Sequence, residues 1–208
     1  MQVTPRKMPS QRRSAATVDI VLEAAARILE DRGMDGFNTN AVADRAGISI
    51  GSLYQYFPCK EALTVALIVR SHRDIATCAR RVLEQSAHLD LDATLATLMD
   101  SLIEMQSTAR GLNRVLEAEE ERLPRIPELT ELELEIQALT EELLARHVDG
   151  NRCSRAQLRT AAADMIAIVR ALLDAALFSG EPDPDDLRAR LVRTVKGYLT
   201  PLLPLAAM

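Results

Sequence analysis

Residues 39–57 read TNAVADRAGISIGSLYQYF, and this stretch decides the fold that we predict for the N-terminal part of the chain. It predicts two short helices, over residues 39–46 and 49–56, with a tight turn at Gly47 between them. Glycine adopts positive φ without a steric penalty, as a sharp turn between helices requires. Ala43 is small enough to let the two helices cross closely. The pattern is typical of a helix-turn-helix, whose second helix enters the major groove of DNA, although a plain helical corner has the same outline.

The rest of the chain also predicts helices. Ala, Leu, Glu and Arg dominate its composition, and no segment alternates in the manner of a strand. An apolar stripe at helical spacing marks residues 15–32, and Gly33 and Gly36 are expected to end that helix. Six further helices are predicted over residues 60–85, 92–108, 112–122, 129–143, 154–178 and 185–199. The sequence therefore predicts an all-α protein of about nine helices.

Three motifs overlap residues 39–57 and extend beyond them on both sides. They are Gly-x-x-Gly-Phe-Asn-Thr from Gly33, Val-Ala-x-x-Ala-Gly-Ile-Ser from Val42, and Gly-Ser-Leu-Tyr-Gln-Tyr-Phe-Pro-Cys-Lys-Glu-Ala-Leu from Gly51. On these motifs, residues from about Ala15 to Leu67 strongly resemble the DNA-binding domain of the TetR family of bacterial transcriptional regulators. The later helices match that family only in number and length. The resemblance implies an N-terminal three-helix DNA-binding domain and a C-terminal helical domain that binds a ligand and dimerises.

The resemblance implies a role in DNA binding for ten residues. Thr39 is similar to the family's phosphate-contacting residue, and a helix N-terminus suits an anion. Tyr54 and Tyr56 resemble phosphate clamps, and Lys60 resembles a further phosphate contact. Gln55 is the candidate for direct readout, because its amide can form two hydrogen bonds with adenine. The remaining candidates lie beside Thr39 or at the start of the second helix: Asn40, Ser49, Ile50, Gly51 and Ser52.

These residues also have structural interpretations. Thr39 can act as a helix N-cap, which is compatible with a phosphate contact. The two tyrosines can pack against the protein instead of DNA, and Gln55 and Lys60 can be solvated surface residues. Leu53 and Phe57, which alternate with the polar positions, are predicted to be core residues.

Charge is distributed unevenly along the 208 residues, whose formal net charge is −5. Residues 1–60 hold eight Lys and Arg against six Asp and Glu, which leaves +2, and the rest holds 17 against 24, which leaves −7. This asymmetry favours an N-terminal part that binds a polyanion, followed by an acidic C-terminal part. We expect a basic flexible arm over residues 1–13, a helix-turn-helix domain over 14–62 and a ligand-binding and dimerisation domain over 63–208. The arm can track the minor groove or phosphates, or it can be a disordered tail; its basic residues are Arg6, Lys7, Arg12 and Arg13.

The acidic C-terminal part is expected to dimerise and to hold a small ligand, as the resemblance implies. Small residues on the helix over 154–178 allow close approach, so the last two helices of two copies can form the homodimer interface. An isologous dimer would read a palindromic operator. Within that part, apolar side chains are candidates for the wall of a pocket for a small, largely apolar effector, although each is also an ordinary core residue: Met99, Leu102, Ile103, Met165, Val169, Leu172 and Phe178.

No enzyme, cofactor or metal site is predicted. The three histidines are isolated, no glycine-rich phosphate loop is present, and three widely spaced cysteines form no zinc or disulfide pattern. Cys59 can be a redox thiol or, without a second cysteine nearby, a bystander. No apolar run approaches the roughly 18 residues of a membrane helix, and no secretory signal is visible, so we expect a cytoplasmic protein without membrane contact. The expected function is a DNA-binding repressor released by its ligand; the alternative is an all-helical small-molecule-binding protein that does not bind DNA.

Overall fold

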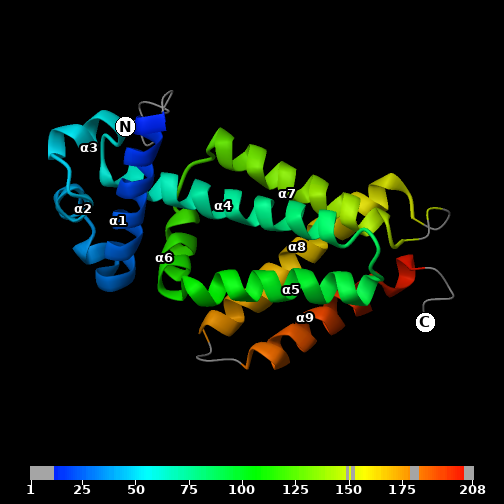
Figure 1. Cartoon of the computed structure of the whole chain (residues 1–208). Helices are drawn as coiled ribbons and strands as arrows, with labels where there is room; N and C mark the ends of the chain where they lie inside the picture. Colours follow the sequence, from blue (N-terminus) through cyan, green and yellow to red (C-terminus); the bar gives the residue numbers. More distant parts are fainter. Residues whose placement is uncertain (1–11, 149, 151–152, 179–182, 204–208) are drawn as a thin grey trace. The chain divides into compact units, whose positions relative to one another are not determined.

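The computed structural model describes residues 12–148, 150, 153–178 and 183–203. Within these residues the chain forms nine α-helices, one 3₁₀-helix and no strand (Figure 1). The elements are α1 (Arg12–Gly36), α2 (Thr39–Ala46), α3 (Ile50–Tyr56), α4 (Lys60–Gln85), α5 (Leu91–Thr108), α6 (Arg110–Glu120), α7 (Pro127–Ala145), α8 (Arg155–Phe178), α9 (Pro184–Leu199) and η1 (Thr200–Leu202). The prediction of an all-α protein of about nine helices is confirmed.

The predicted basic arm falls mostly outside the described residues, which begin at residue 12. Arg12 and Arg13, the last two residues of that arm, already belong to α1, so the first helix begins earlier than the predicted residue 15. None of the helices in the described ranges is both long and apolar enough to cross a lipid bilayer.

The helices pack into two compact units. Unit 1 comprises the chain up to Ser71 together with Ala109–Ile126, so it contains α1, α2, α3, the first part of α4, and α6. Unit 2 comprises His72–Thr108 and the chain from Pro127 onward, with the rest of α4, α5 and α7 to α9. The sequence predicted one division after residue 62, with α6 in the second domain. The structure groups α6 with unit 1 because α6 packs against α1.

Unit 1 is built around α1, which contacts both α2 and α6. Val21, Ala25 and Ile28 follow one another at helical spacing and are at most 2% exposed, so one face of α1 is fully buried. Gly33 has φ 61° and ψ −167°, a conformation that interrupts the helix before it continues to Gly36. The prediction that Gly33 and Gly36 end the helix is confirmed, because the regular helix breaks at Gly33 and α1 ends at Gly36.

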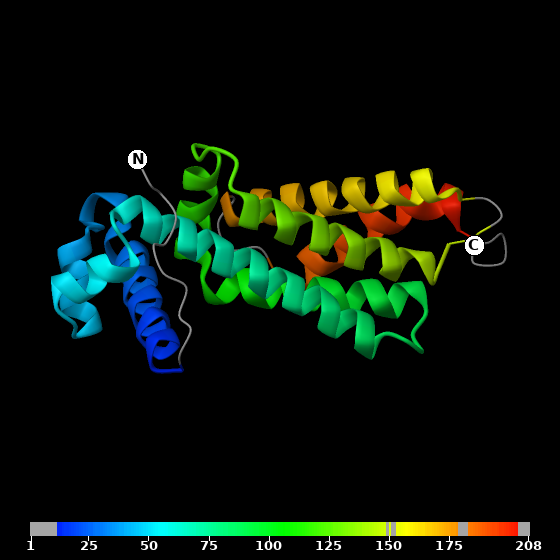
Figure 2. The ribbon, with the colours of Figure 1, turned by 90° about the horizontal axis from the view of Figure 1, so that it is seen from above.

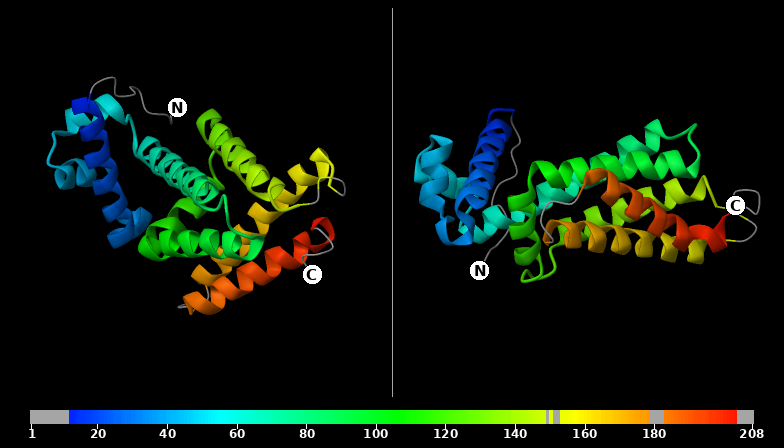
Figure 3. Two further views of the ribbon diagram at one scale, coloured as in Figure 1. Left: turned by 45° about the vertical axis from the view of Figure 1, so that its right-hand side comes forward. Right: turned by 90° about the horizontal axis from the view of Figure 1, so that it is seen from below.

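Unit 2 is a helical bundle with one apolar core. Helices α5 and α9 lie side by side, as do α7 and α8, and α9 also packs against α8 (Figure 2). Figure 3 shows that α8 and α9 run antiparallel. Along α9, Leu187, Leu191, Val195 and Leu199 recur at every fourth position and are at most 4% exposed. This spacing places them on one face of the helix, which is buried in the core of unit 2.

Two ion pairs join α5 to α9 at the edge of this core. The Nζ atom of Lys196 lies 2.6 Å from an Asp92 carboxylate oxygen, and Nη1 of Arg188 lies 3.4 Å from an Asp100 oxygen. The partners are eight residues apart on each helix, so the pairs fix the antiparallel register of α5 and α9. Their side chains are at least 39% exposed, and such pairs contribute only up to about 1 kcal/mol each.

The C-terminal end of α4 is held by a side chain that follows α7. Nη1 of Arg146 donates a hydrogen bond of 2.6 Å to the carbonyl oxygen of Leu83. A cationic donor suits the carbonyl end of a helix, where the last C=O groups lack partners within the helix. The next residue, His147, is half-buried, and its Nε2 has no hydrogen-bond partner within the described part of the chain.

We expect unit 2 to lose stability in mild acid through His147. Burial lowers the pKa of His147 below the usual 6.5, the charge of Arg146 lowers it further, and Asp90 partly opposes them. The unfolded chain therefore binds this proton at a higher pH than the folded chain does. The stability contributed is full above pH 6.5 and falls as the pH drops from 6.5 toward the folded pKa. Thermal unfolding about one pH unit above and below 6.5 measures this change.

The control for this prediction is His147→Gln, which keeps a polar side chain but cannot titrate. Between the higher and the lower pH, the melting temperature of this variant is expected to fall less than that of the natural chain. An equal loss in both proteins would assign the acid sensitivity to other groups.

Candidate functional site

The start of α2 differs from the prediction. Asn38, rather than Thr39, is the N-cap: its backbone is extended, and its Oδ1 accepts a 2.9 Å hydrogen bond from the Ala41 N–H. Thr39 is instead the first residue of the helix. The prediction of Thr39 as the cap was wrong by one residue. The correction leaves the Thr39 hydroxyl free of a capping role.

That hydroxyl joins the two short helices. Oγ1 of Thr39 and the hydroxyl oxygen of Tyr54 lie 3.1 Å apart, within hydrogen-bond distance, and either can donate. The Tyr54 side chain is 42% exposed. The structure thus brings two of the predicted phosphate contacts together, one at the N-terminus of α2 and one on α3. Because a hydroxyl both donates and accepts, the pair can hold its mutual bond and still donate to a phosphate oxygen.

The turn between α2 and α3 rests on Gly47. Its φ of 68° and ψ of 29° lie in the left-handed region, and its N–H donates to the carbonyl oxygens of Ala43 and Asp44. The Ile48 N–H also donates to the Ala43 carbonyl, at 3.1 Å. These bonds satisfy the free carbonyls at the end of α2 and direct the chain sharply into α3.

Replacement of Gly47 by valine is expected to destabilise unit 1 by about 2 kcal/mol, because a β-branched residue is strained at positive φ. Chemical denaturation followed by circular dichroism measures the change. The matched control is Gly47→Asn, since asparagine tolerates the left-handed region and should cost clearly less. Equal losses for the two variants would show that the backbone conformation is not the cause.

The N-terminus of α3 is closed by its own serines. Oγ of Ser49, the N-cap, accepts a 3.1 Å hydrogen bond from the Ser52 N–H, and the two hydroxyl oxygens lie 2.8 Å apart. Ile50 is half-buried as the first residue of α3, and Gly51 is exposed. The four candidates at this helix end are therefore adjacent in space, with two of them already bonded to each other.

Farther along α3 the exposed and buried residues separate cleanly. Leu53 and Phe57 are 0% and 1% exposed, which confirms their prediction as core residues. Gln55 is exposed, and its amide makes no hydrogen bond or ion pair within the described residues. Tyr56 is half-buried. The side of α3 that is not buried therefore presents Tyr54 and Gln55 to the solvent.

Three further candidates flank the helix pair. Asn40 is exposed in the first turn of α2, and Lys60 is exposed as the first residue of α4. Cys59 precedes Lys60 and is half-buried. Burial raises the pKa of the Cys59 thiol, so less of it is the reactive thiolate at neutral pH. This shift favours the bystander interpretation of Cys59 over the redox one.

Sequence reasoning missed two residues that orient α2. Asn38 was not considered as the cap, although asparagine directly before a predicted helix is a recognised N-cap signal. The second is Arg45, whose Nη1 lies 2.8 Å from an Asp31 carboxylate oxygen and so links α2 to α1. These partners are separated by 14 residues and belong to different helices, so no local pattern could have paired them.

The residues predicted to line an effector pocket lie in or against the core of unit 2. Met99 and Met165 are at most 2% exposed, and Ile103 and Val169 are at most 8% exposed. Leu102 and Leu172 are partly buried and pack against this core. The side chain of Phe178 lies outside the described residues. The six described side chains therefore fill space in or against one packed core, and their role in binding an effector stays a prediction.

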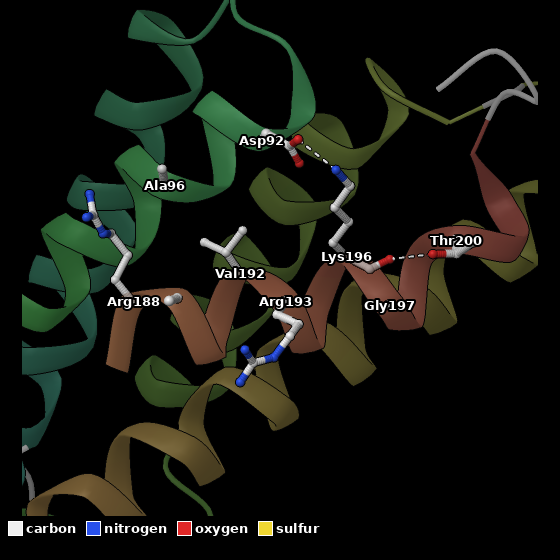
Figure 4. A pocket seen from close by; sticks show the side chains of 9 residues that line it. Asp92, Ala96, Arg188, Val192, Arg193, Lys196, Gly197 and Thr200 are labelled. Carbon is white, nitrogen blue, oxygen red and sulfur yellow. Dashed lines mark hydrogen bonds and ion pairs between the residues drawn. The ribbon is translucent and has the colours of Figure 1, made fainter. Parts of the chain in front are cut away.

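A groove lies elsewhere in unit 2, between α5 and α9 (Figure 4). Its volume is about 660 Å³, and it is shallow and largely open to solvent. None of the predicted pocket residues lines it. The lining residues are Asp92, Ala96, Arg188, Ala189, Val192, Arg193, Lys196, Gly197 and Thr200.

Polar side chains along α8 are paired within unit 2. The Tyr198 hydroxyl donates a hydrogen bond to the Asp164 carboxylate and so joins α9 to α8. Nε of Arg170 lies 4.0 Å from an Asp174 carboxylate oxygen one turn along the same helix. Residues four positions apart on a helix are neighbours on its surface, so this ion pair lies within α8.

Comparisons with known proteins agree with this architecture. Over 78 residues the chain is 33% identical to an uncharacterised helix-turn-helix-type transcriptional regulator of Mycobacterium tuberculosis, a match that covers 38% of this chain and 37% of that relative. A TetR-family transcriptional regulator from Mesorhizobium loti has the same fold, with a TM-score of 0.74, 19% identity, and coverage of 93% of this chain and 100% of that one. SmeT, the repressor of the Stenotrophomonas maltophilia multidrug efflux pump SmeDEF, gives 0.65 at 17% identity, with 92% of each chain covered.

Two family models match separate parts of the sequence. Residues 21–67 match the model for bacterial regulatory proteins of the tetR family, and residues 90–199 match the model for a tetracyclin repressor-like C-terminal domain. The second match alone covers more than half of the chain. The first takes in α2, α3 and the hydroxyl pair between them. The protein therefore belongs to the TetR family of transcriptional regulators and carries a helix-turn-helix DNA-binding domain in unit 1.

Proposed function

We propose that the protein is a transcriptional repressor that binds a palindromic operator as a homodimer and is released by a small ligand. The observation that carries the proposal is the exposed side of α3, where Tyr54 and Gln55 stand about one turn beyond the capped N-terminus of the helix. Recognition helices of this kind enter the major groove with their N-terminal residues toward the base edges.

Phosphate contacts are assigned to the residues at the edges of the helix pair. The Thr39 and Tyr54 hydroxyls, together with Tyr56 and Lys60, would position the domain on the backbone of the duplex. Gln55 would read a base, and the side chains near the start of α3 would add contacts in the groove: Ser49, Ile50, Gly51 and Ser52. Asn40 lies beside Thr39, where it can reach either the backbone or a base.

The homodimer is assigned to α8 and α9. Ala163, Ala167 and Ala171 recur at every fourth position of α8 and are exposed, so they form a flat strip where a second copy can approach closely. Two recognition helices related by a twofold axis would then read successive major grooves about 34–36 Å apart. This geometry requires a palindromic operator.

Ligand-induced release is supported by family membership and by a relative. SmeT has been solved in complex with triclosan, a small molecule. In a regulator of this type, a ligand that binds one dimer conformation better shifts the population toward it. If the spacing of the recognition helices in that conformation does not fit two grooves, the operator complex weakens, because the two binding events are thermodynamically coupled.

The test is binding of the purified chain to the DNA that flanks its own coding region, measured by mobility shift at two salt concentrations. We expect specific binding that weakens steeply with salt. Tyr54→Phe should lower the affinity about tenfold, since a hydrogen bond to a charged phosphate is lost. Gln55→Ala should relax discrimination at one base pair by about 1–3 kcal/mol.

The matched control is Gln85→Ala, which truncates an exposed glutamine at the end of α4 in unit 2. It should bind DNA as the natural chain does. Absence of binding to the flanking DNA, followed by failure to select any sequence from a random duplex library, would refute the repressor. That result would favour the alternative of a small-molecule-binding protein without DNA-binding activity.

A further inference from the structure

Thr94 differs from the other hydroxyl-bearing residues of α5. Thr97, Ser101 and Thr108 each donate a hydrogen bond to the carbonyl oxygen four residues earlier, at 2.8, 3.0 and 2.8 Å. The Thr94 side chain is 0% exposed, and its Oγ1 has no hydrogen-bond partner within the described residues. A buried hydroxyl without a partner is destabilising, and nearly all such groups in proteins are bonded to protein or to ordered water. The Thr94 hydroxyl therefore calls for a partner inside unit 2.

A second buried hydroxyl of this kind lies across the turn between α4 and α5. Ser86 directly follows α4, is 2% exposed, and its Oγ has no partner in the part of the chain that the structure describes. The Leu89 N–H donates to the Ser86 carbonyl at 3.0 Å, and the Thr94 N–H donates to the Asp90 carbonyl at 3.0 Å. Leu89 and Asp90 are consecutive, so these two bonds hold Ser86 and Thr94 at the same end of unit 2.

The segment after α7 brings a third polar atom to this turn. Nε2 of His147 is buried and has no partner among the described residues. The preceding residue, Arg146, donates to the carbonyl of Leu83, three residues before Ser86, at 2.6 Å. Asp90 is also near, since its charge partly opposes the lowering of the His147 pKa by burial and by Arg146. The ends of α4 and α7 and the start of α5 thus share one location.

The chemistry of the three atoms defines what can bind them. Each hydroxyl can donate one hydrogen bond and accept two, and a ring nitrogen of a neutral imidazole donates or accepts one. A charged ligand is not favoured, because the cation at this location, Arg146, is already bonded to the Leu83 carbonyl and to Glu142, at 2.6 and 3.2 Å. Leu83 and Leu144 are at most 5% exposed in the same core, so a large ligand is not favoured either.

We propose that unit 2 binds an internal water molecule between the ends of α4, α5 and α7, held by the hydroxyls of Ser86 and Thr94 and by Nε2 of His147. Three polar partners match the number of hydrogen bonds that a buried water usually makes. The water would satisfy the three atoms together and link three helix ends that are distant in sequence. This site is independent of the proposed repressor function.

The experiment is magnetic relaxation dispersion of the solvent in a solution of the full chain, which detects water molecules that stay inside a protein longer than the protein takes to rotate. We expect Thr94→Val to lack a long-lived water that the natural chain holds. Ser86→Ala, on the other side of the turn, should lose the same signal. The matched control is Thr140→Val, which removes a buried hydroxyl of unit 2 that donates to the Ile136 carbonyl at 2.9 Å, and it should keep the signal.

Thermal unfolding gives a second readout, whose sign decides. Valine has nearly the shape of threonine, so Thr94→Val changes little besides the hydroxyl. If the hydroxyl is bonded to water, the melting temperature should fall by about 2–4 °C, as the loss of one hydrogen bond predicts for a chain of this length. If the hydroxyl has no partner, the melting temperature should rise, because a buried unsatisfied polar group is removed. Ser86→Ala should cost less in the Thr94→Val chain than in the natural chain, because the two hydroxyls share one water.

A long-lived water that persists in Thr94→Val or in Ser86→Ala would overturn the site, as would a higher melting temperature for Thr94→Val. Loss of the same signal in Thr140→Val would also overturn it, because the water would then lie elsewhere in the core. Strictly additive losses of stability for Thr94→Val and Ser86→Ala would show that the two hydroxyls have separate partners, which contradicts a shared water.

Discussion

Replacement of Leu53 by alanine is expected to lower the free energy of unfolding of unit 1 by about 3 kcal/mol. Leu53 is 0% exposed and lies on α3, on the side opposite to the exposed Tyr54 and Gln55. Truncation removes buried methyl groups and leaves a cavity that a packed core closes only in part. The measurement is urea denaturation followed by circular dichroism. Because the same residue holds the recognition helix in place, operator binding should fall with the stability.

The matched control for Leu53 is Ile20→Ala, also in unit 1. Ile20 on α1 is 53% exposed, so its truncation creates no cavity and should change stability by no more than about 0.5 kcal/mol. Similar losses in the two variants would contradict the burial that anchors α3.

Replacement of Met99 by alanine is expected to lower the free energy of unfolding of unit 2 by about 3 kcal/mol. Met99 is 0% exposed in the core of unit 2, where its side chain fills space among the other helices. If Met99 instead lined an open effector pocket, its truncation would leave stability nearly unchanged and would alter ligand affinity. The same urea experiment therefore decides between a core residue and a pocket wall.

Leu134 provides the control for Met99. It lies on α7 in the same unit but is 62% exposed, so Leu134→Ala should be nearly neutral. A small loss for Met99→Ala, comparable to that of Leu134→Ala, would contradict its place in a packed core and would favour a pocket wall.

The helix-turn-helix could be predicted because its signals are local. Gly47 was predicted to allow a sharp turn, and it adopts positive φ there. Leu53 and Phe57 were predicted as core residues from their alternation with polar positions, and both are fully buried. Each of these inferences depends only on residues within one or two helical turns, where side-chain direction follows directly from sequence spacing.

The details that failed depend on a single backbone rotation or on partners far apart in sequence. The cap of α2 fell on Asn38 instead of Thr39, because the N-cap is the residue whose backbone is still extended, and neighbouring residues with oxygen-bearing side chains compete for that position. The packing of α6 against α1, which groups α6 with unit 1, was not foreseen. Sequence spacing carries no information about which of two neighbouring helix groups an amphipathic helix will cover.

By itself, the sequence determined that the chain is helical, that residues 39–57 form a helix-turn-helix, and which side of its second helix is buried, because helical periodicity and glycine conformation are local properties. Only the tertiary structure decided that the Thr39 and Tyr54 hydroxyls meet, that Lys196 pairs with Asp92, and that a groove opens between α5 and α9. These features join residues 15 to 104 positions apart, or arise from space left between helices. A cavity depends on how side chains of several elements fail to fill a volume, and that is settled only when the helices pack together.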